Sequence, residues 1–171
     1  MQQKWNQNFD GEPMTDIPQK FLNAGCDVYM VMQLQHDEKN LDERFASMRE
    51  LHRRGKTPDP EQYEVTYYAD LPAMWQDVSN NEILEELFQM FNLSRPQDFE
   101  GHSLSVSDVI ALKRNGEVSV HYVDSIGFKD LQGFLDKQPE RTSVLQNLKE
   151  KCDAPECNPT VCRKARDAHE L

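Results

Sequence analysis

The dipeptide Asn115-Gly116 constrains the fold of this chain more than any other feature of its sequence. Both residues accept positive φ angles, and Asn-Gly is the strongest short signal for a two-residue turn between antiparallel strands. An apolar run, VIAL, begins before the turn at Val109, and an alternating run, EVSVHYV, begins after it at Glu117. The sequence therefore predicts a β-hairpin over these two runs.

The second strand of this hairpin alternates between apolar and polar residues. Val118, Val120 and Tyr122 should share one face, and Ser119 and His121 the other, because successive side chains of a strand point to opposite sides. We expect the first face to pack on helices and the second to remain polar.

Two earlier segments predict further strands. Residues 26–34 (CDVYMVMQL) and 63–71 (YEVTYYADL) are rich in β-branched and aromatic residues. With the hairpin, they predict an α+β protein that has a small, mostly antiparallel sheet of about four strands with helices packed on it.

Helical spacing of apolar residues predicts a helix over residues 41–54, with Gly55 as its stop signal. The apolar positions are Leu41, Phe45, Met48 and Leu51. The same segment carries Arg44, Arg49, Arg53 and Arg54. We interpret these arginines as a solvated helix face in preference to a nucleic-acid contact.

A second helix is predicted to begin after Ser79, which forms a capping-box pattern with Glu82, and to end near Asn92. Its apolar stripe consists of Ile83, Leu84, Leu87, Phe88 and Phe91. The predicted partner-binding residues are Glu82, Glu85, Glu86, Asp98 and Glu100. They form either an electrostatic footprint for a basic groove or simply a solvated face.

The length of 171 residues fits one domain with additional ends. We expect a loosely ordered arm over residues 1–24, a single domain over residues 25–150 and a cysteine-containing tail over residues 151–171. The domain should include a short helical piece after Gly127 and a C-terminal helix after Pro139. No apolar run approaches the length of a membrane span, so we expect a cytoplasmic protein without membrane contact.

The net charge of −11 argues against direct nucleic-acid binding, because neutralising phosphates requires a basic surface. The segment 70–100 contains seven acids and one base, so basic proteins are the more natural partners.

Residue types of a hydrolytic triad occur twice, as His102 with Ser103 and as His121 with Asp124 and Ser125. No nucleophile-elbow motif or Gly-rich oxyanion loop accompanies either group, so we interpret both as structural. The chain also lacks a phosphate-binding loop, a dinucleotide fingerprint and an HExxH motif. The sequence thus predicts a protein without enzymatic activity.

A candidate zinc site lies in the tail, where three thiols and an imidazole occur close together. The four donors are Cys152, Cys157, Cys162 and His169. Their spacing is wider than in common zinc modules, so reduced surface thiols are the alternative. Cys26 or His102 is an alternative fourth ligand, and a zinc ion with four protein ligands would be structural.

The segment from Gly101 to Leu135 resembles the YodL-like domain. The resemblance rests on the run GHSLSVSDVIAL, the Asn-Gly turn, the run HYVDSIGF and the following Phe134-Leu135. It extends more weakly to residue 26, so the arm and the tail lie outside it.

The resemblance implies a genetic context rather than a reaction. YodL-like domains occur in proteins of mobile elements of Gram-positive bacteria, which also carry antirestriction and anti-CRISPR proteins. We therefore expect a counter-defence protein that binds and inhibits a CRISPR effector nuclease or a similar nucleic-acid enzyme. The alternative is a modulator of a host cytoskeletal or cell-shape protein, as implied by the namesake branch in Bacillus.

Overall fold

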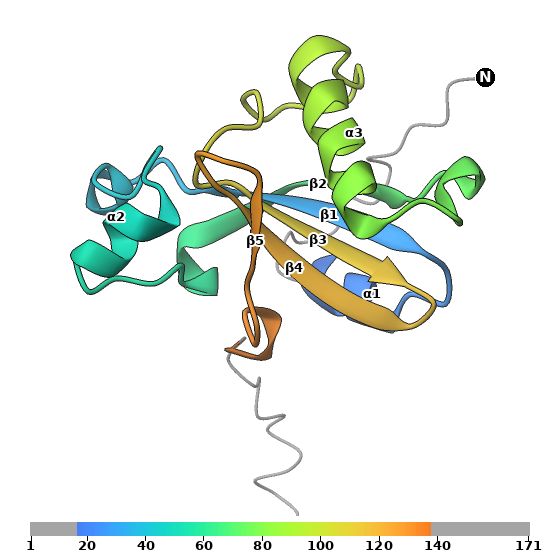
Figure 1. Cartoon of the computed structure of the whole chain (residues 1–171), viewed down its shortest axis with the longest axis horizontal. Coiled ribbons are helices and arrows are strands. Elements are labelled where there is room, and N and C mark those ends of the chain that lie inside the picture. The colour runs from blue at the N-terminus through green and yellow to red at the C-terminus, as the bar shows by residue number, and fades with distance from the viewer. Residues whose placement is uncertain (1–16, 138–171) are drawn as a thin grey trace, which may run out of the picture. The chain divides into compact units, whose positions relative to one another are not determined.

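The computed structural model describes residues 17–137, which form a mixed α+β fold (Figure 1). Its helices are α1 (Ile17–Asn23), α2 (Met48–Arg53) and α3 (Asn80–Leu93). Its strands are β1 (Val28–Leu34), β2 (Tyr63–Asp70), β3 (Val109–Arg114), β4 (Glu117–Val123) and β5 (Phe128–Asp130). Four 3-10 helices complete the order: η3 (Glu38–Asn40), η4 (Pro60–Gln62), η5 (Ala73–Trp75) and η6 (Leu135–Lys137).

The five strands form one antiparallel sheet in the order β2-β1-β3-β4-β5. Strand β1 is buried at every position, and its side chains alternate between two apolar cores. Val28 and Met30 lie in the first core, with residues of α1 and α2. Tyr29 and Val31 lie in the second core, with the apolar stripe of α3. Helices therefore cover both faces of the sheet.

The predicted hairpin is confirmed. Strands β3 and β4 pair from Val109 opposite Tyr122 to Arg114 opposite Glu117. The two residues between them, Asn115-Gly116, have φ angles of 51° and 81°. Positive φ at both positions is what a two-residue turn that follows the twist of the strands requires.

Side chains on both faces of β4 are buried, whereas the alternating sequence predicted one apolar and one polar face. Val120 and Tyr122 are buried in the first core, as expected. His121 on the other face is polar, as expected, but it is only 5% exposed. The reason is that β5 pairs alongside β4 at His121, while the second core continues on this face through Val123.

Helix α1 lies within the segment that we expected to be a loosely ordered arm. Ile17 and Phe21 are fully buried in the first core, and Lys113 Nζ donates to the carbonyl oxygens of Leu22 and Ala24 at 2.7 and 2.6 Å. A helix of seven residues has too few turns for a periodic pattern, and packing rather than propensity stabilises it. Residues 1–16 lie outside the described part of the chain.

The predicted helix over residues 41–54 is shorter in the structure. Helix α2 begins only after Ser47, which forms a capping box with Glu50: Ser47 Oγ accepts from Glu50 N, and Glu50 Oε2 accepts from Ser47 N. Hydrogen bonding at the start of a helix satisfies backbone donors that have no partner inside it. Ser47 therefore determines where the helix begins. The spacing of apolar residues alone predicted a start at residue 41, which is too early.

Leu41 and Phe45 precede this helix and are 59% and 65% exposed. Their predicted place on a buried helix face is therefore wrong. Phe45 has a φ of 60°, a left-handed conformation that interrupts helical geometry between residue 41 and α2. The arginines at positions 49, 53 and 54 are exposed, as expected for a solvated face.

The segment after Gly127 forms strand β5, where we predicted a short helical piece. Gly127 has a φ of 70°, and its carbonyl oxygen accepts from Asp124 N, which closes a turn and returns the chain alongside β4. Phe134 and Leu135 still bury their side chains in the first core. The helix predicted after residue 139 lies outside the described residues.

Within residues 17–137, no helix is both long and apolar enough to cross a membrane. The longest of them, α3, has 14 residues and a polar outer face.

The hairpin turn gives a test of this architecture. Replacing Gly116 by Ala should lower the free energy of unfolding by about 1 kcal/mol, because an L side chain is strained at positive φ. Gly25→Ala is a matched control, since a Cβ atom added there would meet no other atom within 4 Å and the φ of Gly25 is not left-handed. Urea denaturation followed by circular dichroism measures both changes, and equal effects of the two replacements would contradict the predicted turn strain.

Candidate functional site

The five predicted partner-binding acids lie on α3 or shortly after it. Glu82, Glu85 and Glu86 are exposed on the helix, whose opposite side packs into the second core. Glu100 is exposed in the following segment, and Asp98 is half-buried there. We call the exposed carboxylates of Glu85, Glu86 and Glu100 the acidic surface.

Two of the five acids have structural partners. Glu82 Oε2 accepts from the backbone nitrogen and the hydroxyl of Ser79 at 3.1 and 2.7 Å, which confirms the predicted capping box. These hydrogen bonds lower the pKa of Glu82. Asp98 Oδ1 accepts from the hydroxyl of Tyr67 at 3.4 Å. Within residues 17–137, by contrast, neither Glu85 nor Glu86 forms an ion pair.

The predicted zinc ligands of the tail lie outside the described residues. Of the alternative ligands, Cys26 is exposed and its thiol contacts Asp70, while His102 belongs to a separate polar network. Among the residues that the structure describes, no group of three or more His, Cys, Asp and Glu side chains is placed to hold a metal ion.

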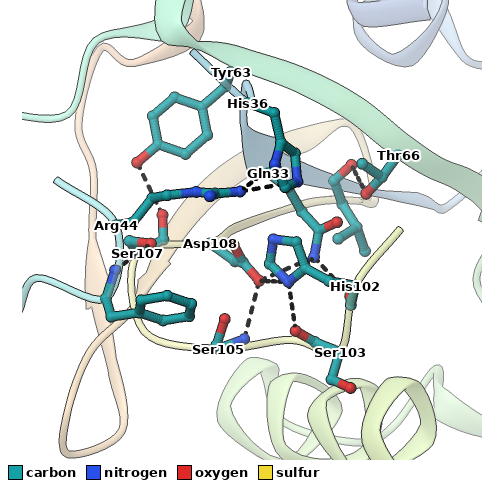
Figure 2. A network of polar contacts seen from close by, with 12 residues as sticks. Gln33, His36, Arg44, Tyr63, Thr66, His102, Ser103, Ser105, Ser107 and Asp108 are labelled. Atoms are coloured by element: carbon teal, nitrogen blue, oxygen red, sulfur yellow. Dashed lines mark hydrogen bonds and ion pairs between the residues drawn. The ribbon is translucent and has the colours of Figure 1, made fainter. Parts of the chain in front are cut away.

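A buried polar network joins the segment before β3 to the end of β1 (Figure 2). Its centre is Asp108, which is 1% exposed. Asp108 Oδ2 accepts from Gln33 Nε2 at 3.0 Å and from the backbone nitrogen of Ser105 at 2.9 Å. The ring of His102 approaches the same oxygen, with Nδ1 at 3.8 Å. The carboxylate thus holds three separate parts of the loop and the sheet together.

The carbonyl oxygen of Ser103 sets the tautomer of His102, because both amide protons of Gln33 have other acceptors. Gln33 Nε2 has two protons, which reach the carbonyl oxygen of His102 at 2.8 Å and Asp108 Oδ2. His102 Nδ1 lies 2.8 Å from the carbonyl oxygen of Ser103, an acceptor, so Nδ1 carries a proton in this arrangement. The imidazole therefore donates to the backbone carbonyl oxygen of Ser103.

Close packing around Gly101 explains why glycine begins this segment. A Cβ atom at Gly101 would lie 2.4 Å from Gln33 Oε1 and 2.7 Å from the ring of Phe99. Both neighbours are fixed, Gln33 by the Asp108 network and Phe99 by its edge contact with Phe91. Only glycine allows this approach without displacing one of them.

Ser107 connects the network to the turn that precedes α2. Its Oγ accepts from the backbone nitrogen of Phe45 at 3.2 Å, and its carbonyl oxygen accepts from the hydroxyl of Tyr63 at 2.9 Å. Both Ser107 and Phe45 have positive φ, 89° and 60°. Positive φ is unfavourable for residues other than glycine. Contacts such as the hydrogen bond between Ser107 and Phe45 therefore hold both backbones in this conformation.

Burial raises the pKa of Asp108 to about 6, although the amide of Ser105, His102 and Gln33 act in the opposite direction. The second carboxylate oxygen, Oδ1, and the hydroxyl of Ser105 are buried without a hydrogen-bond partner in the structure. An uncompensated buried oxygen favours the neutral acid over the carboxylate.

In the group of His121, Asp124 and Ser125, which we interpreted as structural, the aspartate binds backbone nitrogens and not the imidazole. Asp124 Oδ1 accepts from the backbone nitrogens of Met48 and Ser125, at 3.2 and 2.8 Å. His121 instead contacts Ser119 on its own strand and Asp130 on β5. No local pattern indicated this grouping, because it depends on the register between β4 and β5.

The fold and the network define a small α+β domain in which a buried carboxylate fixes the segment before a hairpin. The chain belongs to the YodL-like domain family, whose model matches residues 28–134. The matched region begins at the first residue of β1 and ends just before η6, so it includes the network and excludes α1. No curated protein and no solved structure is detectably similar to the chain.

The raised pKa of Asp108 predicts a pH dependence of stability. The pKa is about 6 in the folded protein and about 3.8 without burial, so the folded state binds the proton more tightly. Asp108 therefore contributes its full stabilisation below about pH 4. As the pH rises to about 6, the free energy of unfolding decreases by about 3 kcal/mol. In Asp108→Asn this decrease should be absent, as measured by urea denaturation across that pH range.

Asp42→Asn provides the control, because it removes an exposed carboxylate of the same type. Its pH dependence should match that of the unmodified chain. A slope between pH 4 and 6 that persists in Asp108→Asn would assign the effect to other groups.

Proposed function

We propose that this chain acts as a protein-binding inhibitor of a nucleic-acid enzyme and that the acidic surface makes the contact. The observation that carries the proposal is the pair Glu85 and Glu86, two exposed carboxylates on a rigid helix with no ion pair in the described part of the chain. Their helix is anchored by four fully buried apolar residues, so the carboxylates are presented in a fixed arrangement.

Charge favours a basic partner surface. With a net charge of −11, the chain repels nucleic acid but is attracted to the positively charged groove that an enzyme uses to bind it. Complementary charges raise the association rate and orient the two proteins before contact. An acidic surface that occupies such a groove excludes the nucleic acid without any chemical reaction.

Family membership directs the choice of target. A YodL-like domain implies a protein of a mobile element, and nucleases of host defence are the enzymes that threaten such an element. We therefore place a CRISPR effector nuclease first among the targets. If zinc is bound by the tail cysteines, we expect it to stabilise that segment rather than to react.

A second candidate is a modulator of a host cytoskeletal or cell-shape protein, which the same family membership favours. It differs in its cellular effect, because expression should alter cell shape while CRISPR interference is unaffected. Microscopy combined with a plasmid-interference assay separates the two candidates.

Charge reversal tests the proposed surface. Glu85→Lys with Glu86→Lys should weaken inhibition of DNA cleavage by a purified CRISPR effector at least about tenfold, because two attractive contacts become repulsive. Raising the salt concentration should weaken the unmodified chain in the same direction. The readout is the protein concentration that halves the cleavage rate.

The matched control is Glu38→Lys with Glu61→Lys, which changes two exposed glutamates away from α3 and alters the net charge equally. This variant should inhibit like the unmodified chain. Undiminished cleavage with the unmodified chain in excess would rule out the CRISPR effector as the target, and equal losses in both variants would rule out the acidic surface as the contact.

A further inference from the structure

Three side chains at the junction of β4 and β5 lie in a chain of short contacts. Ser119 Oγ is 2.9 Å from His121 Nε2, and His121 Nδ1 is 2.7 Å from Asp130 Oδ1. His121 and Asp130 are direct cross-strand partners, while Ser119 lies two residues before His121 on the same side of β4. The order hydroxyl, imidazole, carboxylate is the one that activates a serine in hydrolases.

The protonation state suits proton transfer from the serine. Asp130 accepts a hydrogen bond only from a protonated Nδ1, which leaves Nε2 of a neutral imidazole as the acceptor for the Ser119 hydroxyl. Burial lowers the pKa of His121, and the nearby Asp130 only partly opposes this effect. The imidazole is therefore neutral at pH 7 and able to accept a proton.

Ser119 lines a pocket of about 210 Å³ whose other walls are mostly polar. The lining residues are Asn80, Arg114, Asn115, Glu117, Val118 and Ser119. His121 lies beneath the serine at 5% exposure, whereas Asp130 is largely exposed. The hydroxyl is thus the member of the group that a small molecule in the pocket reaches.

Asn80 supplies an oriented donor beside the serine. Arg114 Nη1 donates to Asn80 Oδ1 at 2.6 Å, and this hydrogen bond turns the amide so that Nδ2 faces Ser119 Oγ at 3.4 Å. Arg114 is itself fixed by the carbonyl oxygens of Trp75 and Gln76 at 3.1 and 2.8 Å. An amide donor fixed in this way is able to stabilise negative charge that develops next to the serine.

We propose that Ser119, His121 and Asp130 form a hydrolytic site for small polar esters. Ser119 Oγ bonds to the carbonyl carbon of the ester while its proton passes to His121 Nε2, and the carbonyl oxygen becomes an oxyanion that accepts from Asn80 Nδ2. The bond to the alcohol then breaks, and the alcohol leaves with the proton from His121. Water repeats the sequence on the acyl-serine and releases the acid.

The polar side chains of Arg114 and Glu117 in the lining favour an ester with a polar acyl group, and the pocket volume restricts that group to a small one. Asp130 acts as a positioning residue, since it touches the imidazole and not the serine. This activity goes beyond the proposed inhibition and does not depend on it, because Glu85 and Glu86 are not among the residues that line the pocket.

The test is covalent labelling of the full chain with a fluorophosphonate probe, followed by peptide mass spectrometry, together with hydrolysis of p-nitrophenyl acetate. We expect an adduct on Ser119 and none in Ser119→Ala. His121→Asn should reduce the labelling rate at least about 100-fold, the lower range of general-base effects. The rate in the unmodified chain should rise with pH and reach half its maximum below pH 6.5, because burial lowers the pKa of His121.

Asp130→Asn keeps the test decisive if the buried His121 variant fails to fold, since the side chain of Asp130 is 77% exposed. It should retain the thermal melting curve of the unmodified chain and lose about tenfold in labelling rate through misorientation of the imidazole. Ser125→Ala, an exposed serine outside the group, is the control with unchanged labelling. The absence of an adduct on Ser119, or equal labelling rates in Asp130→Asn and the control, would overturn the proposal.

Discussion

The hydrogen bond from Gln33 Nε2 to Asp108 Oδ2 is the interaction on which the rest of the structure depends. Gln33 lies in β1, which is buried along its whole length, so its amide must find partners inside the protein. It finds them in the segment 101–108, which is held over the end of the strand. Ser107 is then placed to bind both Phe45 and Tyr63, and Asp108 leads directly into β3. One buried amide thus fixes the start of the hairpin and the turn before α2.

The network at Asp108 defines one path for the loop, but its burial also lowers the stability of the folded protein. Two oxygens, Asp108 Oδ1 and Ser105 Oγ, remain without hydrogen bonds in the protein, and leaving them so costs free energy. Replacing the network by apolar residues would remove that cost but also the hydrogen bonds that define the path of the loop. The chain belongs to a family whose matched region contains every member of this network, including Gly101, His102 and Asp108.

Local patterns in the sequence predicted most of the sheet and helix α3. The Asn115-Gly116 turn and the capping box of Ser79 each involve only a few consecutive residues. Both can therefore be recognised in the sequence without knowledge of the fold. Helix α1, strand β5 and the exposed Phe45 were missed because each depends on contacts with distant segments. The α1 helix, for example, is held by Lys113 of β3, about ninety positions later in the chain.

The candidate sites follow the same division. The acids of α3 were predicted from charge and periodicity alone, and the structure adds that Glu82 and Asp98 already have partners. The grouping of Ser119, His121 and Asp130 was not predicted, since the sequence placed only Asp124 and Ser125 near His121 and we interpreted that group as structural. Which carboxylate meets the imidazole is decided by the turn at Gly127, which brings Asp130 opposite His121.

Strand β2 is an edge strand of the sheet, and its pairing with β1 is interrupted once. The register shifts between Val31 and Met32, whose partners are Tyr67 and Val65, so Thr66 is an extra residue on β2. Its hydroxyl donates to the carbonyl oxygen of Val31 at 3.4 Å. A bulge of this kind increases the twist of a strand and breaks the even row of donors and acceptors along it. A strand of another chain therefore pairs less readily with this edge of the sheet. This disfavours edge-to-edge aggregation at high concentration.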